Sequence, residues 1–373
     1  MADKKINIAI IGLGFGKEFI PIYQQHQNVG RVAICARNPI AVKEAAAKFS
    51  IDDDMCFTDY HDILKREDID AIHVVTPIYE HYKQSLESLE AGKHTACTVP
   101  MAMTVDECKT LVRARNKANK VYMMMETSLY TREYIYVKNM VESGKIGRVQ
   151  FVRGSHMQNM SLEGWPDYWL GLPPMLYGTH AISPLLAINN TVAESVVCHG
   201  SGAIGDMLAK KYGSPFAVET ATFKLKDSDV IAEATRSLFE TVRQYRESFD
   251  IYGDKQAFEW DQIADEGQVL FEGGELARRF QVPDTDAILP QEIRKFALRE
   301  SIEDKKHVSF IQGSGHGGSH PHLVHEFIRS IVEGRKSSVD AIESASYTSA
   351  GICAQESAMK GGERVYLPDF RKL

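Results

Sequence analysis

The chain opens with an apolar segment that leads directly into a cluster of glycines. Residues 6–11 read INIAII, and Gly12, Gly14 and Gly16 follow at alternate positions. A buried-type strand that ends in glycines before a helix forms the first part of a dinucleotide-binding βαβ unit. The glycines let the backbone turn tightly and approach a pyrophosphate at the helix N-terminus. Glycines alone are weak evidence, but their position after an N-terminal strand strengthens it. The segment therefore predicts a nicotinamide dinucleotide and redox chemistry.

Two positions depart from the common G-x-G-x-x-G fingerprint. Lys17 stands where the last glycine would fall, so we expect the first helix to sit further from the sheet. After the next predicted strand, where an Asp or Glu would bind the ribose 2′-hydroxyl of NAD, this chain has Ala36 and Arg37. A guanidinium there removes repulsion against the 2′-phosphate of NADP, so the sequence is compatible with both NAD(H) and NADP(H). Arg37 fits a solvated turn residue equally well.

The composition is that of an ordinary globular protein, with 44% hydrophobic and 25% charged residues among 373. This length predicts two domains. The net charge of -7 and the lack of a basic run give no indication of nucleic acid binding. None of the six cysteines forms a C-x-x-C pair, so neither a disulfide framework nor a zinc knuckle is indicated. With no signal-like segment and no run approaching about 18 apolar residues, we expect a cytoplasmic protein without a membrane partner.

Strand and helix patterns alternate up to residue 125, which favours a parallel, doubly wound sheet. The predicted strands there are residues 6–11, 31–35, 71–76, 94–97 and 121–125, and the predicted helices are residues 17–26, 40–49, 81–91 and 105–118. Thr104 and Glu107 have the spacing of a capping box at the start of the last helix. We therefore predict a Rossmann dinucleotide-binding domain over residues 1–125.

Beyond Met125 the pattern changes to longer runs that alternate apolar and polar residues, as in an antiparallel sheet with one wet face. The predicted strands are residues 149–157, 195–200, 218–225, 230–238, 248–252 and 364–367, and the predicted helices are residues 132–142, 181–188, 320–332 and 341–359. Residues 273–318 are expected to be largely loop. We predict a substrate-binding and oligomerisation α+β domain over residues 126–373, whose open, mainly antiparallel sheet pairs subunits in a homo-oligomer.

A sheet of the first kind binds its ligand at the C-terminal ends of its strands. Thr76 and Pro77 follow one such end and would lie beside the nicotinamide ribose. His81 opens the next helix, and a hydrogen-bonding role at that helix start explains it better than a ligand contact. The residues that we expect at the cofactor are Gly12, Gly14, Phe15, Gly16, Ala36, Arg37, Thr76, Pro77, His81, Thr98, Val99 and Pro100.

In combination, four motifs resemble the Gfo/Idh/MocA family of sugar and polyol oxidoreductases over nearly the whole chain. They are GLGFG from Gly12, VVTPIYEH from Val74, AGKHTACTVPMAMTVDE from Ala91 and VESGKIGRV from Val141. Two family motifs are altered. The usual Glu-Lys-Pro, whose lysine acts as acid, base or positioning group, is replaced by residues 98–100, TVP. We consider Lys17 and Lys93 as substitutes for the missing lysine.

The second altered motif is the family's D-x-x-x-H-x-x-D helix, in which this chain keeps only His180 and has Leu176 and Ser183 at the acidic positions. The two altered motifs resemble those of a subgroup that includes NAD-dependent glycosidases such as α-N-acetylgalactosaminidases. The subgroup also shares the M-M-E-x-x-x-Y pattern from Met124 and the LPDF ending from Leu367. The resemblance implies oxidation of a sugar hydroxyl, usually at C3, by a tightly held nicotinamide. The keto group then permits elimination at C1, water addition and return of the hydride, whereas a glycoside 3-dehydrogenase stops after the first step.

Removal of the hydroxyl proton requires a base, and histidine is the natural choice near neutral pH. We choose His180, because the family placement outweighs the ordinary structural role of a histidine on an apolar helix. Tyr177 lies one turn before it and could relay or orient the proton, or pack between the domains. His156 lies on a predicted strand, near a position where the related glycosidases have a tyrosine that takes part in proton chemistry at C2.

Five residues are candidates for substrate binding. Glu126 and Tyr130 fit sugar hydroxyl binding and buried structural roles equally well. Trp165 and Trp169 could stack on the C–H face of a sugar or pack in the core. His316 begins a histidine-rich turn without a neighbouring acidic residue, so we favour a substrate contact over helix capping and predict no metal site.

The sequence as a whole predicts an NAD(P)-dependent dehydrogenase that oxidises a small-molecule sugar or glycoside, with C3 as the expected position. The alternative is a redox-assisted glycosidase without net cofactor turnover. A third reading is a nucleotide-sensing binding protein that lost catalysis with the lysine. The products distinguish the dehydrogenase from the glycosidase, because the dehydrogenase releases a keto-sugar and the glycosidase releases a free sugar.

Overall fold

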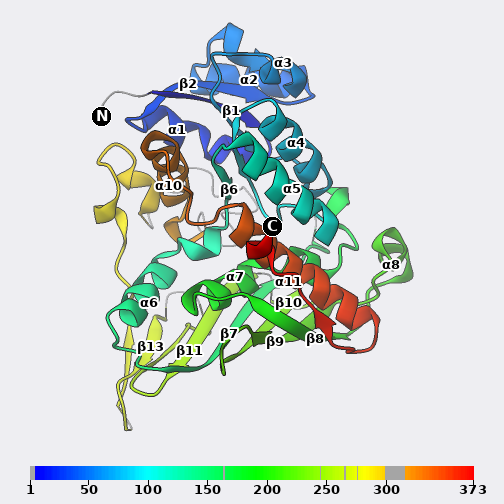
Figure 1. The fold of residues 1–373 in the computed structure, drawn as a ribbon, viewed down its shortest axis with the longest axis vertical. Coiled ribbons are helices and arrows are strands. Elements are labelled where there is room, and N and C mark those ends of the chain that lie inside the picture. Colours follow the sequence, from blue (N-terminus) through cyan, green and yellow to red (C-terminus); the bar gives the residue numbers. More distant parts are fainter. Residues whose placement is uncertain (1–4, 163, 244, 264–265, 275, 299–315) are drawn as a thin grey trace.

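The computed structural model describes residues 5–162, 164–243, 245–263, 266–274, 276–298 and 316–373. Two sheets dominate this part of the chain, and Figure 1 shows the smaller one, near the N-terminus, above the larger one. Helices α7 (Thr179–Ile188) and α11 (Ala341–Met359) lie on the face of the larger sheet that is turned toward the smaller one (Figure 1). The two sheets predicted from the sequence are therefore present.

The first sheet has six parallel strands in the order β3-β2-β1-β4-β5-β6. The strands are β1 (Ile6–Ile11), β2 (Val29–Cys35), β3 (Cys56–Phe57), β4 (Ala71–Val74), β5 (His94–Cys97) and β6 (Tyr122–Met124). Its helices are α1 (Ile20–Gln25), α2 (Pro39–Phe49), α3 (Tyr60–Leu64), α4 (Ile78–Glu90) and α5 (Val105–Ala118). The doubly wound parallel sheet is confirmed, although β3 and α3 were not predicted.

The segment after the glycines differs from the prediction of one helix over residues 17–26. A 3₁₀ turn, η1 (Phe15–Glu18), comes first, and α1 begins only at Ile20. Pro21 favours this late start, because proline has no N–H to donate within a helix and is tolerated in its first turn. The expected wider spacing between the first helix and the sheet stays a prediction. A Cβ on Gly16, in η1, would lie 2.9 Å from Ile10 Cγ2, so this glycine allows a close contact between η1 and β1.

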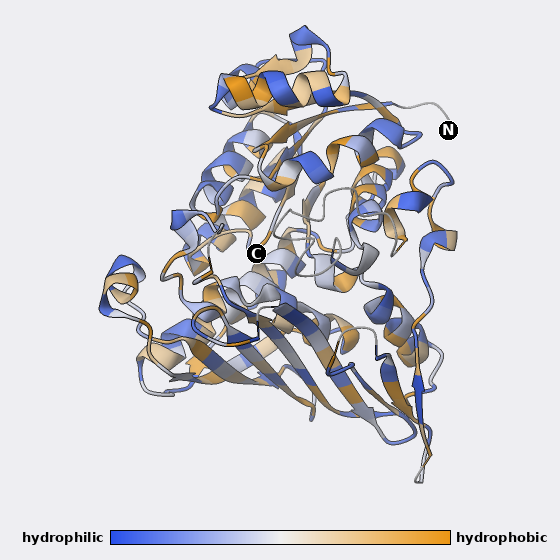
Figure 2. Ribbon diagram, turned by 180° about the vertical axis from the view of Figure 1, so that it is seen from behind, coloured by the Kyte–Doolittle hydropathy of each residue, from blue (hydrophilic) through white to orange (hydrophobic). Residues whose placement is uncertain are grey.

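The second sheet has nine strands in the order β14-β13-β12-β11-β7-β10-β9-β8-β15, and all neighbours are antiparallel except β10 and β7. The strands are β7 (Val149–Gln158), β8 (Ala193–Ser201), β9 (Val218–Leu225), β10 (Ile231–Ser237), β11 (Tyr245–Gly253), β12 (Ala257–Glu259), β13 (Gln268–Phe271), β14 (Ala277–Phe280) and β15 (Val365–Tyr366). Apolar and polar residues alternate along these strands (Figure 2), as the sequence predicted. Short β12, β13 and β14 were missed, and β14 lies in the region expected to be loop.

The remaining helices pack around this sheet and return to the first one. They are α6 (Arg132–Glu142), α8 (Asp206–Tyr212) and α10 (His320–Glu333), with short 3₁₀ turns η2 (Asp53–Met55), η3 (Thr127–Leu129), η4 (Asp167–Trp169), η5 (Pro174–Tyr177), η6 (Asp286–Ile288), η7 (Arg294–Ala297) and η8 (Phe370–Lys372). Near the start of α11, Met124 N donates to Val339 O at 3.1 Å, and Met101 N donates to Thr348 Oγ1 at 3.3 Å. The C-terminal helices thus contact both sheets, and the domain boundary at residue 125 stays a prediction.

Candidate active site

The glycine turn after β1 has one crowded side and one open side. Gly12 has φ +98°, and a Cβ there would lie 2.3 Å from Val75 O, so only glycine fits. Its N–H donates to Cys35 O at 2.9 Å and fixes the turn against β2. A Cβ on Gly14, in contrast, would meet nothing within 4 Å. The backbone at Gly14 is therefore accessible to an approaching group, and this geometry fits a dinucleotide pyrophosphate.

The loops that follow β4 and β5 are joined by His81. Its ring is buried, with Nδ1 at 2.7 Å from Pro100 O and Nε2 at 2.8 Å from Thr76 O. The Thr76 hydroxyl donates to Gln84, and the Thr98 hydroxyl donates to Val74 O. The favoured hydrogen-bonding role of His81 at the helix start is confirmed, and it holds the two loops at the ligand-binding edge of the sheet.

The other predicted cofactor residues occupy the same edge. Ala36 is half-buried and Arg37 exposed directly after β2, where the second strand ends. Val99 is buried, and the Val99–Pro100 peptide is cis. The Phe15 ring meets the ring of His316 edge-on, with 5.7 Å between the centroids. Phe15 thereby connects the glycine turn with the histidine cluster described next.

His180 and Glu126 form a buried ion pair. The Nδ1 atom of His180 lies 2.5 Å from Glu126 Oε1, and both side chains are almost inaccessible. Glu126 Oε1 also accepts hydrogen bonds from the Ser128 N–H at 3.1 Å and the Ser128 hydroxyl at 2.9 Å, and Ser183 donates to Oε2 at 3.3 Å. Protein donors therefore bind both carboxylate oxygens. Glu126, expected at the substrate, contacts the predicted base instead.

Charge pairing outweighs burial in this pair. Burial alone would lower the pKa of His180, but the charges of Glu126 and Glu247 raise it above the ordinary value. Burial alone would raise the pKa of Glu126, but His180 and the hydrogen bond from Ser128 hold it below the ordinary value. Both directions favour an ionised Glu126 carboxylate with a hydrogen-bonded proton on Nδ1, and Nε2 becomes free to accept a proton only above the raised pKa of His180.

The other ring nitrogen of His180 faces a polar cluster. Its Nε2 atom lies 3.3 Å from the Tyr177 hydroxyl and 4.0 Å from Glu247 Oε1. The ring of His156 lies 5.1 Å from that of His180, and the ring of His316 lies 6.0 Å from it. The structure thus brings together four of the predicted residues, from β7, η5, α7 and the turn before α10.

Local structure explains how His180 is presented. Helix α7 lies directly on β7, because Gly154 has no side chain and a Cβ there would lie 2.2 Å from Ala181 O. Within α7, Pro184 lacks the N–H that would pair with the His180 carbonyl four residues earlier. The histidine therefore sits in the first turn of a helix packed against the sheet, with its ring between the two layers.

Several residues of the cluster were not predicted. Glu247 accepts a hydrogen bond from the Tyr245 hydroxyl, and burial raises its pKa against the opposing effects of His180 and Tyr245. Arg236 is fully buried and donates to Tyr177 O at 2.9 Å, to His156 O at 3.0 Å, to Ser237 O at 2.6 Å and to Gln158 Oε1 at 2.7 Å. Burial lowers the pKa of Arg236 to about 10. A charged residue within the predicted strand 230–238 was the available signal for Arg236, whereas Glu247 lay outside the predicted strand 248–252.

Comparison with known proteins identifies the family. Residues 6–126 match the family model described as "Oxidoreductase family, NAD-binding Rossmann fold". This N-terminal segment is that of the Gfo/Idh/MocA oxidoreductase family. The segment is therefore an NAD-binding Rossmann domain, and the geometry at Gly12 and Gly14 agrees with that assignment.

Distant relatives of this protein carry a glycosidase name. A "Glycosyl hydrolase family 109 protein" from Shewanella baltica (strain OS195) is 25% identical over 337 residues, which cover 84% of this chain and 72% of that protein. Another protein of that name, from Shewanella sp. (strain W3-18-1), is 23% identical over 98% of this chain and 85% of its own length.

Solved structures show the same fold over the whole chain. Levoglucosan dehydrogenase in complex with NADH and levoglucosan superposes with a TM-score of 0.78 at 20% identity, covering 98% of this chain and 100% of that one. Myo-inositol 2-dehydrogenase from Lactobacillus plantarum gives 0.76 at 19% identity, with the same coverage. Among the described residues of this chain, the helices are too short or too polar to cross a membrane.

The altered lysine motif has no replacement at Lys93. Its ammonium donates to Arg66 O at 2.5 Å and Ile69 O at 2.8 Å, next to the start of β5. The ligand-binding edge of a parallel sheet is at the opposite, carboxyl ends of the strands. The suggestion that Lys93 substitutes for the missing family lysine is therefore wrong.

The predicted aromatic platform lies next to Tyr177. The ring of Trp169 is 4.6 Å from that of Tyr177, and Trp165 is 6.3 Å from Trp169. Both tryptophans are half-buried and pack on a small apolar cluster, so they combine a packing role with an exposed face. They remain candidates for a sugar-stacking surface.

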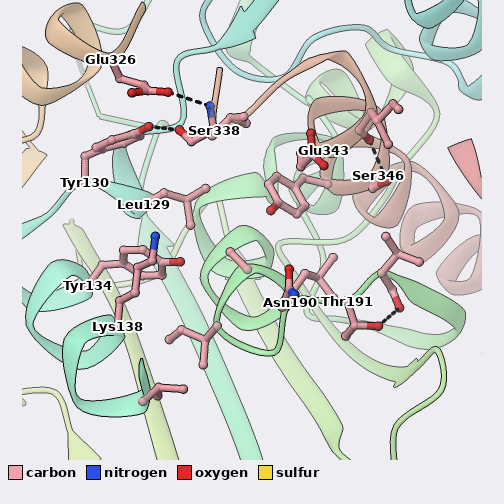
Figure 3. A pocket seen from close by; sticks show the side chains of 18 of the residues that line it. Leu129, Tyr130, Tyr134, Lys138, Asn190, Thr191, Glu326, Ser338, Glu343 and Ser346 are labelled. Atoms are coloured by element: carbon pink, nitrogen blue, oxygen red, sulfur yellow. Dashed lines mark hydrogen bonds between the residues drawn. The ribbon is translucent and has the colours of Figure 1, made fainter. Parts of the chain in front are cut away.

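Tyr130 does not join the histidine cluster. Its hydroxyl pairs with Ser338, and it lines a separate pocket of about 810 Å³ shown in Figure 3. Tyr134, Lys138 and Glu343 also line this pocket, which lies between α6, α7 and α11. The proposed substrate contact of Tyr130 therefore has no support from its position.

Proposed function

We propose that this protein oxidises a secondary hydroxyl of a sugar or glycoside, at C3, with His180 as the general base. The observation that carries the proposal is the buried Glu126–His180 pair with Nε2 directed at a polar cluster. NAD(P), when bound at the glycine turn, accepts the hydride from the carbon that bears the hydroxyl. The proposal also includes a homo-oligomeric, cytoplasmic protein that uses NAD(H) or NADP(H), as expected from the sequence.

The residues of the cluster divide the proton chemistry between them. The Nε2 atom of His180 takes the hydroxyl proton, while Glu126 stabilises the resulting imidazolium through Nδ1 at 2.5 Å. Tyr177, 3.3 Å from the same Nε2, orients or relays that proton. Val99 at the family's lysine position supplies no ionisable group, so this step depends on His180 and Tyr177.

The sugar is bound by groups around this atom. His156, His316 and Glu247 offer hydrogen-bonding atoms on the cluster side, and Trp169 borders Tyr177. In support of a sugar ligand, the similar levoglucosan dehydrogenase structure contains levoglucosan and NADH. A hydroxyl-rich ligand matches a cluster in which charged and polar side chains converge.

A second function, that of a redox-assisted glycosidase, is favoured by one specific feature. The cluster holds a second group able to exchange protons, Glu247 with Tyr245, beside His156. After oxidation at C3, one base removes the C2 proton while the C1–O bond breaks and the leaving group takes a proton. Water then adds at C1 and the hydride returns to C3. The glycosyl hydrolase names of distant relatives agree with this alternative.

Proton NMR of the purified protein with a panel of glucosides in D₂O, with and without NAD or NADP, tests the proposal. A 3-keto product with equimolar reduced cofactor supports the dehydrogenase. Free sugar with deuterium at C2 and no net reduction identifies the glycosidase. Cofactor binding without turnover of any sugar contradicts both and leaves the binding-protein reading.

Two histidine variants make this experiment specific. His180→Ala should lower the rate by about 10²–10⁴-fold, the usual contribution of a general base. His199→Ala is the matched control, because His199 is exposed on β8, far along the sheet from β7. Equal rates for the two variants would refute the role of His180.

A further inference from the structure

Two histidines and a glutamate from three different elements direct their donor atoms at one point. His156 lies on β7, His180 on α7 and Glu247 on β11, and one donor atom from each lies within 4.8 Å of the other two. His156 Nε2 is 3.8 Å and His180 Nε2 is 4.0 Å from Glu247 Oε1. His156 and Glu247 are direct cross-strand partners, so the sheet register fixes their proximity.

The second observation is that His156 is buried without hydrogen-bond partners. Its side chain is 1% exposed, and neither Nδ1 nor Nε2 has a hydrogen-bond partner in the described part of the chain. An unpaired polar group in a protein interior destabilises the fold and calls for a ligand, ion or water. Burial, with the charge of Arg236, lowers the pKa of His156 well below its ordinary value, so the ring is neutral and its lone pair free.

We propose that this cluster binds a divalent transition-metal cation of the zinc class, with His156, His180 and Glu247 as its protein ligands. Two imidazoles and one carboxylate form the donor set of open zinc sites, in which further positions remain for other ligands. This goes beyond the proposed function and contradicts our expectation from the sequence that the chain has no metal site.

The spacing allows coordination with small movements. Three atoms within 4.8 Å of one another have a common point no more than about 2.8 Å from each. Zinc bonds to histidine nitrogen and carboxylate oxygen are about 2.0–2.2 Å. Each ligand therefore moves inward by about 0.8 Å at most, which a side-chain rotation accommodates. His316 Nε2, 4.0 Å from Glu247 Oε1, is the nearest further imidazole.

The surroundings also suit a cation. Glu126 accepts the Nδ1 proton of His180, which leaves Nε2 as the ligand atom in the usual carboxylate–histidine–metal arrangement. Tyr245 orients Glu247 in the same way. The buried cluster contains two carboxylates, Glu126 and Glu247, against one guanidinium, Arg236, so it keeps one excess negative charge when its histidines are neutral.

A metal ion bound at this cluster would inhibit catalysis, because His180 takes part in both. In the proposed function, on which this step alone rests, Nε2 of His180 accepts the hydroxyl proton. A metal at the same atom blocks that lone pair, so the metal and the sugar hydroxyl exclude each other. Zinc is then a competitive inhibitor with respect to sugar.

Calorimetric titration of chelator-treated, full-length protein with Zn²⁺, without NAD or sugar, tests the binding. We expect one Zn²⁺ per chain, and at least tenfold weaker binding in both His156→Ala and Glu247→Gln. His199→Ala removes an exposed histidine and should bind Zn²⁺ like the unaltered protein. Titration with Co²⁺ gives a visible absorption band for the histidine-bound metal, and circular dichroism shows whether each variant is folded.

The outcomes separate this inference from the proposed function. Lack of binding in the unaltered protein, or binding that persists in folded His156→Ala and Glu247→Gln, overturns the metal site. A protein that binds Zn²⁺ but oxidises no sugar keeps the metal site and loses the proposed function. A protein that oxidises sugars and binds no Zn²⁺ does the reverse.

Discussion

Replacing Gly12 with alanine should destabilise the protein, whereas the same change at Gly14 should mainly affect cofactor binding. At Gly12 the new methyl group would lie 2.3 Å from Val75 O, on a backbone with φ +98°. Such a conformation costs a non-glycine residue about 1–3 kcal/mol. Relief of the overlap costs about 1–3 kcal/mol more, as for other overpacked sites. We expect Gly12→Ala to lower the free energy of unfolding by about 2–6 kcal/mol.

Gly14 provides the matched control, two residues away in the same turn. Its φ of -64° is not left-handed, its ψ of -87° lies a little outside the helical range, and a Cβ there meets nothing within 4 Å. The free energy of unfolding of Gly14→Ala should therefore fall by no more than about 1 kcal/mol. If the open side faces the pyrophosphate, the methyl group should weaken NAD binding at least tenfold, or by about 1.4 kcal/mol.

Urea unfolding followed by circular dichroism measures the first effect, and calorimetric titration with NAD measures the second. The reasoning requires the two variants to separate, one losing stability and the other losing affinity. A Gly12→Ala protein that unfolds at the urea concentration of the unaltered chain would refute the steric argument. A Gly14→Ala protein that binds NAD normally would show that the open side of the turn is not the cofactor side.

Three further predictions concern charged groups. Glu126→Gln removes a charge that raises the pKa of His180, so the rise of kcat/KM for sugar oxidation with pH should move to lower pH. An unchanged pH profile would show that the Glu126–His180 pair takes no part in catalysis. Burial raises the pKa of Glu219 from 4.5 to about 7, so between these pH values the folded chain keeps a proton that the unfolded chain has lost. The free energy of unfolding should therefore fall as the pH rises from about 4.5 to about 7. Glu219→Gln should abolish that fall and gain about 3 kcal/mol at pH 8, measured from urea midpoints across pH. Arg236→Met leaves buried carbonyls of Tyr177 and His156 unpaired, which should cost at least about 3 kcal/mol in urea unfolding, and a smaller loss would contradict the bonding described.

Local patterns were sufficient for much of the fold. Helix α5 begins and ends as predicted, and the Thr104 hydroxyl accepts from the Glu107 N–H at 3.2 Å while the Glu107 carboxylate accepts from the Thr104 N–H at 3.0 Å. A capping box involves groups only three residues apart, so its spacing can be read directly from the chain. The strand β1 and the turn at Gly12 were readable for the same reason.

Other elements depend on partners that are distant in sequence. Strands β12 and β13 are short, and they form because β11 and β14 offer hydrogen-bonding edges to them. The predicted strand 248–252 left out Glu247, although β11 extends to Tyr245 by pairing with β7. In the candidate site, His180 and Tyr177 were accessible to prediction because they are only three residues apart in the chain. Glu247 and Arg236 were not, because their importance comes from strand pairing and burial.

By itself, the sequence determined the parallel sheet, the glycine turn and a histidine at the start of an apolar helix. These are consequences of periodicity and backbone conformation, which act over a few residues. Only the tertiary structure decided what surrounds that histidine. The packing of α7 on β7 and the register of β11 against β7 place Glu126, His156 and Glu247 around His180, where exclusion of water makes each charge alter its neighbours.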